Sequence, residues 1–293
     1  MKILLIGKNG QLGWELQRAL SPLGDVTAVD LPEVDLVDER AIRKLVRRIK
    51  PTVIVNPAAY TSVDRAESEP DVAWAVNGIA PGILAEEALD LQAGLIHFST
   101  DYVFDGTTGK AYVEGDHPNP LNVYGKSKLA GEQAIQRVGK AFLIIRTSWV
   151  YSTRQGGFVN KVLQWARQQS ILRIASDQVS NPTWCRMLAE AIAQVLVMGK
   201  QNIYLWLDER KGIYHLTGAG YVSRFEWARA ILDLDPRRNE QIVEELRPAL
   251  TAEFPTPATR PLYTPLCSER FYDTFGLWLP GWRETLELAM SVG

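Results

Sequence analysis

Two side chains in the middle of the chain have the types and the spacing for proton transfer. Tyr124 and Lys128 stand four positions apart in the run YGKSK, so on a helix they share one face, about 6 Å apart along the axis. A tyrosine with its ordinary pKa of about 10 is a poor acid or base near neutral pH. A neighbouring ammonium favours the phenolate and lowers that pKa. The pair therefore predicts that Tyr124 donates a proton to a carbonyl or accepts one from an alcohol.

A hydroxyl group that could hydrogen-bond the same reacting oxygen comes from Ser99 or Thr100, which end an apolar run at 94–100. Ligands of parallel sheets bind at the carboxyl ends of the strands. Neighbouring side chains of a strand point to opposite faces, so only one of the two hydroxyls faces the site. We predict that Thr100 is the third catalytic residue and that Ser99 caps the strand end.

A glycine-rich loop near the start of the chain has the spacing of a dinucleotide site. Gly7, Gly10 and Gly13 form the pattern G-x-x-G-x-x-G between an expected strand and an expected helix. In such loops the first glycine permits a tight turn, the second lets the backbone approach a pyrophosphate, and the third lets the helix pack closely on the sheet. The pyrophosphate lies on free N–H groups at the positive end of the helix. The alternative is a turn that binds no ligand.

An acidic residue follows the loop at the distance expected for a dinucleotide. Asp30 ends the next apolar run, about 17 residues after Gly13, where a carboxylate can accept hydrogen bonds from the adenosine ribose. This favours NADH electrostatically without excluding NADPH, and a plain loop aspartate or helix cap is the alternative. In such a site Lys128 would also hold the nicotinamide ribose, and the nicotinamide charge would further lower the pKa of Tyr124.

Short apolar runs alternate with helical patterns through the first half of the chain. Continuously apolar strands separated by helices are typical of a parallel sheet that is covered on both faces. With right-handed crossovers this arrangement becomes a doubly wound, Rossmann-like α/β fold. Strands are expected at 2–7, 25–30, 52–56, 94–100 and 142–147, and helices at 11–20, 39–49, 71–91 and 122–138.

The second half is less regular and richer in proline and tryptophan. Helical patterns recur at 159–169, 183–198 and 223–232, a short strand is expected at 213–217, and 202–211 is expected to be an exposed loop or hairpin. We predict a dinucleotide-binding domain at residues 1–150. We assign 151–293 mainly to a smaller substrate-binding domain, partly interleaved, with some segments returning to the sheet.

The composition excludes several classes of protein. Hydrophobic residues make up 46% of the chain, and 32 Lys and Arg residues against 34 Asp and Glu residues give a net charge of −2. A near-neutral chain has no broad basic field, so we expect neither a nucleic-acid partner nor a membrane partner. Two cysteines and three scattered histidines support neither a disulfide framework nor a zinc site. No run is long enough for a membrane span or a signal peptide, so a cytoplasmic protein is expected.

Six segments, in this order along the chain, together resemble the extended short-chain dehydrogenase/reductase family. They are GKNGQLGWELQ, VNPAAYTSVDRAESEP, STDYVFDG, PLNVYGKSKLAGE, RTSWVY and TPATRP. The resemblance covers nearly the whole chain. It implies a catalytic triad of Thr100, Tyr124 and Lys128.

The resemblance also implies the residues that bind the ligands. The glycine-rich loop and the resemblance together predict which residues bind the dinucleotide. They are Gly7, Gly10, Gln11, Leu12, Gly13, Asp30, Asp35, Leu36, Ala59, Tyr60, Thr61, Tyr124 and Lys128. The substrate is assigned to Thr100, Asp101 and Trp149. An aromatic side chain at a strand end is well placed beside a sugar or base, although Trp149 could instead be ordinary core packing.

The residues after Thr100 separate reaction types within the family. Sugar-nucleotide dehydratases resemble TDEVYG, in which an Asp–Glu pair removes water, whereas here Asp101 is followed by Tyr102. The resemblance therefore implies NADPH- or NADH-dependent reduction of the C4 keto group of dTDP-4-dehydro-β-L-rhamnose, giving dTDP-L-rhamnose. The alternatives are a reductase or epimerase of another nucleotide sugar, and an NADP-binding regulatory subunit of a methionine adenosyltransferase.

One departure from the family concerns a metal. Some reductases of this type look to be dimers in which glutamates bind a bridging magnesium ion. Glu15 matches one of these glutamates, but the positions of the other two hold Arg186 and Val292. A single carboxylate is a poor magnesium site. We therefore expect no metal, and a monomer or a homodimer without a metal bridge.

Overall fold

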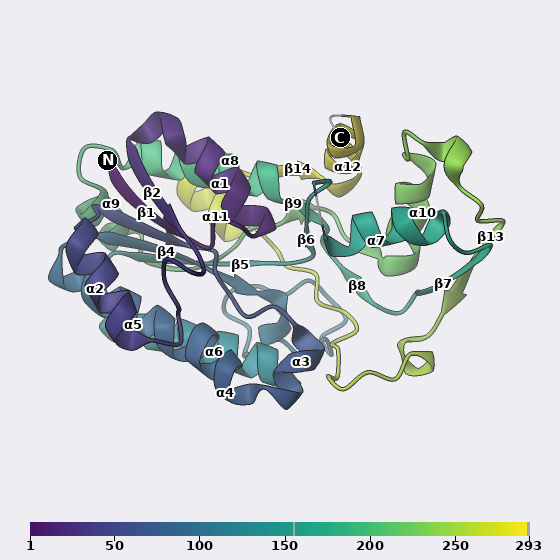
Figure 1. The fold of residues 1–293 in the computed structure, drawn as a ribbon, viewed down its shortest axis with the longest axis horizontal. Helices are drawn as coiled ribbons and strands as arrows, with labels where there is room; N and C mark the ends of the chain where they lie inside the picture. Colours follow the sequence, from purple (N-terminus) through teal and green to yellow (C-terminus); the bar gives the residue numbers. More distant parts are fainter. Residues whose placement is uncertain (155, 292–293) are drawn as a thin grey trace.

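A six-stranded parallel sheet forms the centre of the molecule in the computed structural model, which describes residues 1–154 and 156–291 (Figure 1). The strand order is β10-β5-β4-β3-β1-β2. The chain builds β1 and β2, then crosses back to place β3 on the other side of β1, so the winding reverses between β1 and β3. This confirms the doubly wound sheet. The strands are β1 (Lys2–Ile6), β2 (Asp25–Val29), β3 (Val53–Asn56), β4 (Gly94–Thr100), β5 (Phe142–Thr147) and β10 (Gly212–His215).

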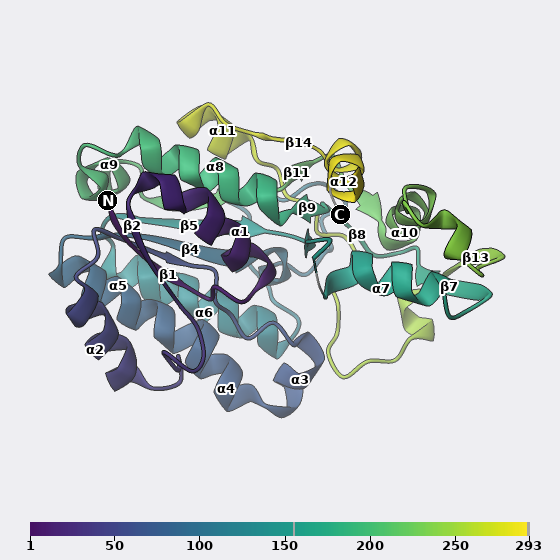
Figure 2. The ribbon, with the colours of Figure 1, turned by 45° about the horizontal axis from the view of Figure 1, so that its top comes forward.

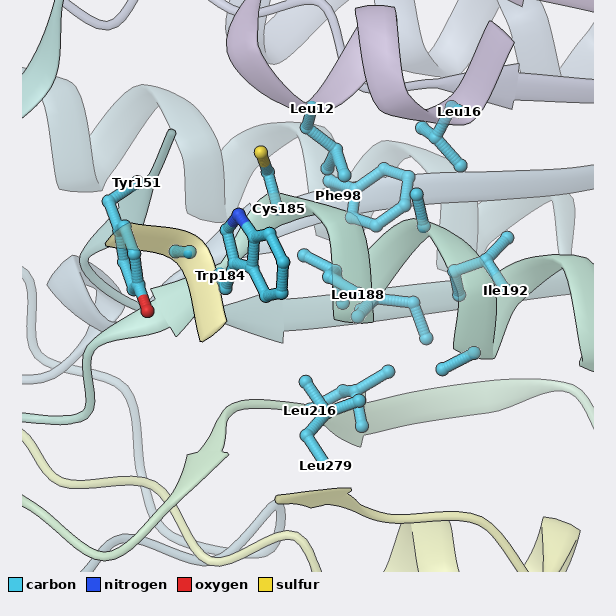
Figure 3. Close-up of a cluster of buried hydrophobic side chains, with 14 of the residues drawn as sticks. Leu12, Leu16, Phe98, Tyr151, Trp184, Cys185, Leu188, Ile192, Leu216 and Leu279 are labelled. Atoms are coloured by element: carbon cyan, nitrogen blue, oxygen red, sulfur yellow. The ribbon is translucent and has the colours of Figure 1, made fainter. Parts of the chain in front are cut away.

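Helices cover both faces of this sheet, as Figures 1 and 2 show. Successive side chains of a strand enter different cores, because a pleated strand alternates faces: Ile3 and Leu5 belong to one buried cluster, and Leu4 and Ile6 to the other. The first cluster packs under α1 (Gln11–Leu20) and α8 (Cys185–Met198), where Leu12, Leu16, Leu188 and Ile192 meet (Figure 3). The opposite face carries α2 (Glu39–Ile49), α5 (Ala80–Asp90) and α6 (Val123–Val138).

The second half extends beyond the carboxyl edge of the sheet and also returns to it. β10 pairs in parallel with β5, so a strand from the second half completes the sheet. Short two-stranded pairs, among them β7 with β13 and β8 with β12, hold the remaining segments together. These other elements are β6 (Val150–Tyr151), α7 (Gly157–Ala166), β7 (Ile171–Ala175), β8 (Val179–Ser180), β9 (Thr183–Trp184), α9 (Ile203–Glu209), β11 (Gly218–Ala219), β12 (Val222–Ser223), α10 (Arg224–Asp233), β13 (Glu245–Ala249), α11 (Glu269–Phe275), β14 (Leu279–Gly281) and α12 (Trp282–Ser291).

Two sequence expectations need correction. The loop or hairpin expected at 202–211 is the helix α9, because the Asn202 side chain accepts a hydrogen bond from the Leu205 backbone and caps it, while Ile203 and Leu207 are buried. The single helix expected at 71–91 is interrupted: α4 (Pro70–Trp74) runs into a π-helical turn at Ala75–Ile79 before α5 begins. A further short helix, α3 (Val63–Ser68), precedes them.

A buried ion pair joins α6 to the sheet. Arg146 of β5 donates to Glu132 of α6 from Nε at 2.9 Å and from Nη2 at 2.7 Å, and the Ser99 hydroxyl donates to the same carboxylate at 2.5 Å. The side chains of Arg146 and Glu132 are 2% and 0% exposed. Each buried charge offsets the cost of removing the other from water, so a charge that loses its partner strongly destabilises the fold.

Removing one member of this pair should therefore destabilise the fold far more than removing both. We expect Glu132→Met to lower the free energy of unfolding by about 3–5 kcal/mol, because it leaves an uncompensated buried guanidinium. The double replacement Glu132→Met/Arg146→Met should recover most of that loss. Urea unfolding followed by circular dichroism checks both, and equal losses in the single and double variants would contradict this assignment.

Candidate active site

A cavity of about 390 Å³ opens at the carboxyl ends of β1, β3, β4 and β5, where the winding of the sheet reverses. It gathers the glycine-rich loop, the Tyr–Lys pair and the end of β4 into one wall. The lining residues are Gly7, Gly10, Gln11, Leu12, Gly13, Asp30, Pro57, Ala58, Ala59, Thr61, Phe98, Ser99, Thr100, Asp101, Tyr124, Lys128, Thr147, Ser148, Trp149 and Val150.

The glycine-rich loop is shaped by close backbone contacts. Gly7 has φ +98°, in the left-handed region that favours glycine. A Cβ on Gly13 would lie 1.8 Å from the Gly7 carbonyl oxygen, whereas a Cβ on Gly10 would meet only that oxygen, at 3.5 Å. Helix α1 begins behind Gly10 with no side-chain cap and no acidic residue in its first turn. Its N–H groups and its positive dipole end therefore face the cavity uncompensated, as a dinucleotide pyrophosphate requires.

Three residues assigned to the dinucleotide are not part of the cavity wall. Asp35 accepts a hydrogen bond from the Val37 backbone, and Leu36 packs against the core beneath α2 and α5. The Tyr60 hydroxyl donates to Glu69 at 2.5 Å and so points away from the wall, although its neighbours Ala59 and Thr61 line it. Asp30 does line the cavity. Its carboxylate accepts hydrogen bonds from the backbone N–H groups of Asn9 and Leu31, each at 2.9 Å.

Strand alternation separates Ser99 from Thr100. The Ser99 hydroxyl is engaged by Glu132 on the α6 side of the sheet. The Thr100 side chain points the other way, its hydroxyl donates to Asp101 Oδ1 at 3.1 Å, and it lines the cavity together with Tyr124, which lies in the first turn of α6. The arrangement supports the choice of Thr100 over Ser99.

The Tyr124 phenol differs from the sequence expectation in its acidity. Burial raises the pKa of Tyr124 well above its ordinary value, the neighbouring Thr100 hydroxyl lowers it only in part, and nearby Asp101 and Tyr102 raise it further. Lys128 does not lower it, because the ammonium is turned to the Phe98 carbonyl oxygen at 2.6 Å and to His97. The phenol therefore carries its proton at neutral pH, which suits a proton donor.

Two further ionisable groups complete the polar part of the cavity. Burial lowers the pKa of Lys128 to about 8, and Glu132 partly opposes this shift. Burial raises the pKa of Asp101 to about 6, against hydrogen bonds that Thr264 donates at 2.6 Å and Ser180 at 3.2 Å. Both groups can therefore change charge near neutral pH.

Trp149 forms an aromatic wall beside the reacting groups. Its backbone has φ +39°, an uncommon conformation for a bulky residue and one found at ligand sites. Its ring stacks on Trp227 with centroids 5.4 Å apart, and the Arg224 guanidinium lies 4.0 Å from the Trp149 ring centroid. Trp149 therefore does both things considered for it: it packs against the core through Trp227, and it lines the cavity.

Sequence reasoning missed several residues here. Arg224 begins α10 behind the capping box of Ser223, and no motif in the irregular second half marked it as lying beside Trp149. The other missed residues lie on strands or immediately after them, where the strand-end rule could have found them. They are Pro57, Ala58, Phe98, Thr147, Ser148 and Val150.

The candidate metal position is occupied by cations of the chain itself. Glu15 lies 3.1 Å from Arg18 Nε and 3.5 Å from Arg186 Nε, and Val292 lies outside the described residues. Across residues 1–154 and 156–291, no group of three or more His, Cys, Asp or Glu side chains could hold a metal ion. Over the same ranges no helix is long and apolar enough to cross a membrane.

The fold places the chain among the Rossmann-type reductases, and comparison with known proteins makes the assignment specific. A family model described as the RmlD substrate binding domain matches residues 1–292. The dTDP-4-dehydrorhamnose reductase of Burkholderia thailandensis is 39% identical over 293 residues, which cover 99% of this chain and 98% of that relative. The chain belongs to this dTDP-4-dehydrorhamnose reductase family.

Two solved structures agree over the full length. The dTDP-4-dehydrorhamnose reductase of Clostridium acetobutylicum superposes with a TM-score of 0.91 at 33% identity, covering 100% of this chain and 99% of that one. The Bacillus anthracis reductase, solved in complex with NADP, gives a TM-score of 0.88 at 32% identity with 100% of both chains covered.

The loop geometry predicts different outcomes for two glycine replacements. Gly10→Ala should leave the free energy of unfolding nearly unchanged, because its Cβ has room, yet weaken dinucleotide binding about tenfold or more by obstructing the approach of the pyrophosphate. Gly13→Ala should weaken binding and also destabilise the fold by about 1–3 kcal/mol through overpacking. Dinucleotide titration by tryptophan fluorescence, with thermal unfolding alongside, checks both. Full affinity in Gly10→Ala would argue against a pyrophosphate at this loop.

Proposed function

We propose that this protein catalyses NADPH- or NADH-dependent reduction of the C4 keto group of dTDP-4-dehydro-β-L-rhamnose, giving dTDP-L-rhamnose. The observation that carries the proposal is the convergence of Thr100, Tyr124 and Lys128 on the cavity that the glycine-rich loop also lines. The names of the relatives supply the substrate, and the NADP of the Bacillus anthracis relative supports a nicotinamide dinucleotide as the cofactor.

The residues present fit a dinucleotide. The α1 N-terminus offers free N–H groups to a pyrophosphate, Gly10 leaves room for its approach, and the loop backbone lies too close to Gly13 for a side chain there. Asp30 would accept hydrogen bonds from the adenosine ribose, and Lys128 would hold the nicotinamide ribose. The bound dinucleotide supplies the hydride that reduces the carbonyl carbon.

Side chains of the protein protonate and orient the C4 carbonyl oxygen of the sugar. Tyr124, which burial keeps protonated, donates its proton to the oxygen at C4. Thr100, which lines the cavity beside Tyr124, would hydrogen-bond the same oxygen and so orient it. Lys128 would act on the nicotinamide ribose rather than on Tyr124, because its ammonium is turned to the Phe98 carbonyl oxygen and to His97.

The sugar nucleotide would occupy the side of the cavity nearest the second half of the chain. Asp101 would bind the sugar hydroxyls, and the Trp149 ring would pack against the sugar or the base. The Arg224 guanidinium beside that ring is a cation suited to a diphosphate. In this proposal residues 1–150 hold the dinucleotide and 151–293 mainly hold the substrate.

The setting of the enzyme follows from the sequence arguments. We keep the cytoplasm as its location and expect no nucleic-acid partner. We also expect a monomer, or a homodimer without a metal bridge, because Arg18 and Arg186 already neutralise Glu15. This chain has Tyr102 after Asp101 where a dehydratase would have its glutamate, and of the alternatives, a regulatory subunit would not need the three reactive groups.

Removing the proton donor should stop the chemistry and spare binding. Tyr124→Phe should lower kcat by about 10²–10⁴-fold, because the developing alkoxide loses its general acid. Dinucleotide affinity should change little, because the ring is kept. The assay follows NADPH absorbance with a panel of keto-sugar nucleotides. Unchanged turnover would refute the role of Tyr124, and activity only with a different nucleotide sugar would refute the substrate.

The pKa of Lys128 predicts opposite pH effects on activity and stability. Because the ammonium is the active form and its pKa is about 8, kcat/KM should fall as pH rises through 8. In the unfolded chain the pKa returns to about 10.5, so the unfolded state binds more protons between pH 8 and 10.5. The contribution of this group to stability therefore rises with pH in that window, and Lys128→Met should remove it. A pH–rate profile and urea unfolding at several pH values measure both, and a flat profile through pH 8 would contradict the assignment.

A further inference from the structure

We propose that His97, supported by Asn56, is a positioning residue that holds the Lys128 ammonium in place and leaves one of its N–H groups for the cavity. The inference deepens the proposed function and depends on the role given there to Lys128. Neither His97 nor Asn56 lines the cavity, so both act through the lysine.

The three side chains form a continuous buried chain across two strands and a helix. Asn56 of β3 and His97 of β4 are register partners, and Asn56 Nδ2 lies 3.1 Å from His97 Nδ1. Lys128 reaches down from α6 and places its Nζ 3.2 Å from His97 Nε2. Asn56, His97 and Lys128 are 0%, 1% and 1% exposed. No water competes for these contacts at such burial, so each polar atom must be satisfied by its neighbours.

The hydrogen bonds of the ammonium explain why His97 matters. A lysine ammonium has three N–H donors. One donates to the Phe98 carbonyl oxygen at 2.6 Å and a second points at His97 Nε2. The third remains for the cavity, which Lys128 lines. Without His97, only the single bond to Phe98 would fix the direction of the ammonium.

Only a neutral imidazole satisfies this chain, and its tautomer depends on the charge of Lys128. An ammonium only donates, so Nε2 accepts, Nδ1 carries the proton, and the Asn56 amide presents its oxygen. A neutral lysine amine accepts instead from Nε2–H, and the Asn56 amide presents its NH₂ to Nδ1. The structure places Nδ2 against His97 Nδ1, the orientation that matches the neutral amine, and Asn56 Oδ1 has no hydrogen-bond partner. Turning the amide over to present its oxygen therefore breaks no other hydrogen bond.

The charged surroundings agree with this assignment. Burial and the positive charge of Lys128 keep the pKa of His97 well below its ordinary value, so the imidazole stays neutral. On α6 itself Lys128 faces the Glu132 carboxylate, which Arg146 of β5 already pairs, and Tyr124 lies one turn earlier. The neutral nitrogen of His97 therefore stabilises the ammonium form without adding charge.

The test compares three replacements at His97 by the pH dependence of kcat/KM. A glutamine amide reaches the position of Nε2, an asparagine amide reaches only that of Nδ1, and leucine offers neither. We expect His97→Leu and His97→Asn to move the fall in activity to lower pH by about one unit, because the ammonium loses an acceptor. We also expect the KM for the dinucleotide to rise about tenfold. His97→Gln should restore both values toward those of the unchanged protein.

The matched control is Leu95→Ala, which creates a cavity on the same face of β4 without touching Lys128. It should lower stability and leave the pH profile in place. A profile in His97→Leu that matches Leu95→Ala, or no difference between His97→Gln and His97→Asn, would overturn the inference. If the protein reduces none of the keto sugars, the effect of His97 can still be measured. The readout is then the pH dependence of dinucleotide affinity, followed by fluorescence without a sugar substrate. Failure of the proposed function is thus distinguishable from failure of this inference.

Discussion

The structure depends on how ionisable groups are buried between α6 and the central sheet. Lys128 and Glu132 point from α6 into its buried interface with the sheet, and His97 and Arg146 of the sheet meet them there. Charged groups persist in such a place only when each has a partner. The pairing fixes α6 against β4 and β5, and that fixes Tyr124, one turn before Lys128, at the mouth of the cavity.

The two sides of the cavity differ in the groups that they present to a ligand. The side near α1 offers backbone N–H groups and glycines, a rigid surface suited to a pyrophosphate. The side near the second half offers the Trp149 ring and the Asp101 carboxylate, with the Arg224 guanidinium stacked on that ring, a combination suited to a sugar nucleotide. Between them lie Thr100 and Tyr124. The net charge of −2 is therefore compatible with two anionic ligands, because recognition is local.

Local pattern was enough to predict the sheet, the glycine-rich loop and the placement of Ser99 and Thr100 on opposite faces of their strand. Apolar runs specify buried strands, and pleat alternation separates Ser99 from Thr100. It failed at 202–211, where burial of Ile203 and Leu207 decides for a helix. It also failed for the acidity of Tyr124, which depends on how deeply the phenol is buried and on where the lysine ammonium points. Arg224 was missed because only the tertiary fold brings it to Trp149.

In the proposed reaction Thr100 and Tyr124 together hold the oxygen at C4. A crystal structure with NADP⁺ and dTDP-L-rhamnose tests this most directly. We expect the C4 hydroxyl within about 2.5–3.0 Å of both Thr100 Oγ1 and Tyr124 Oη. A product whose C4 hydroxyl lies away from both side chains, with another sugar hydroxyl in its place, would contradict it.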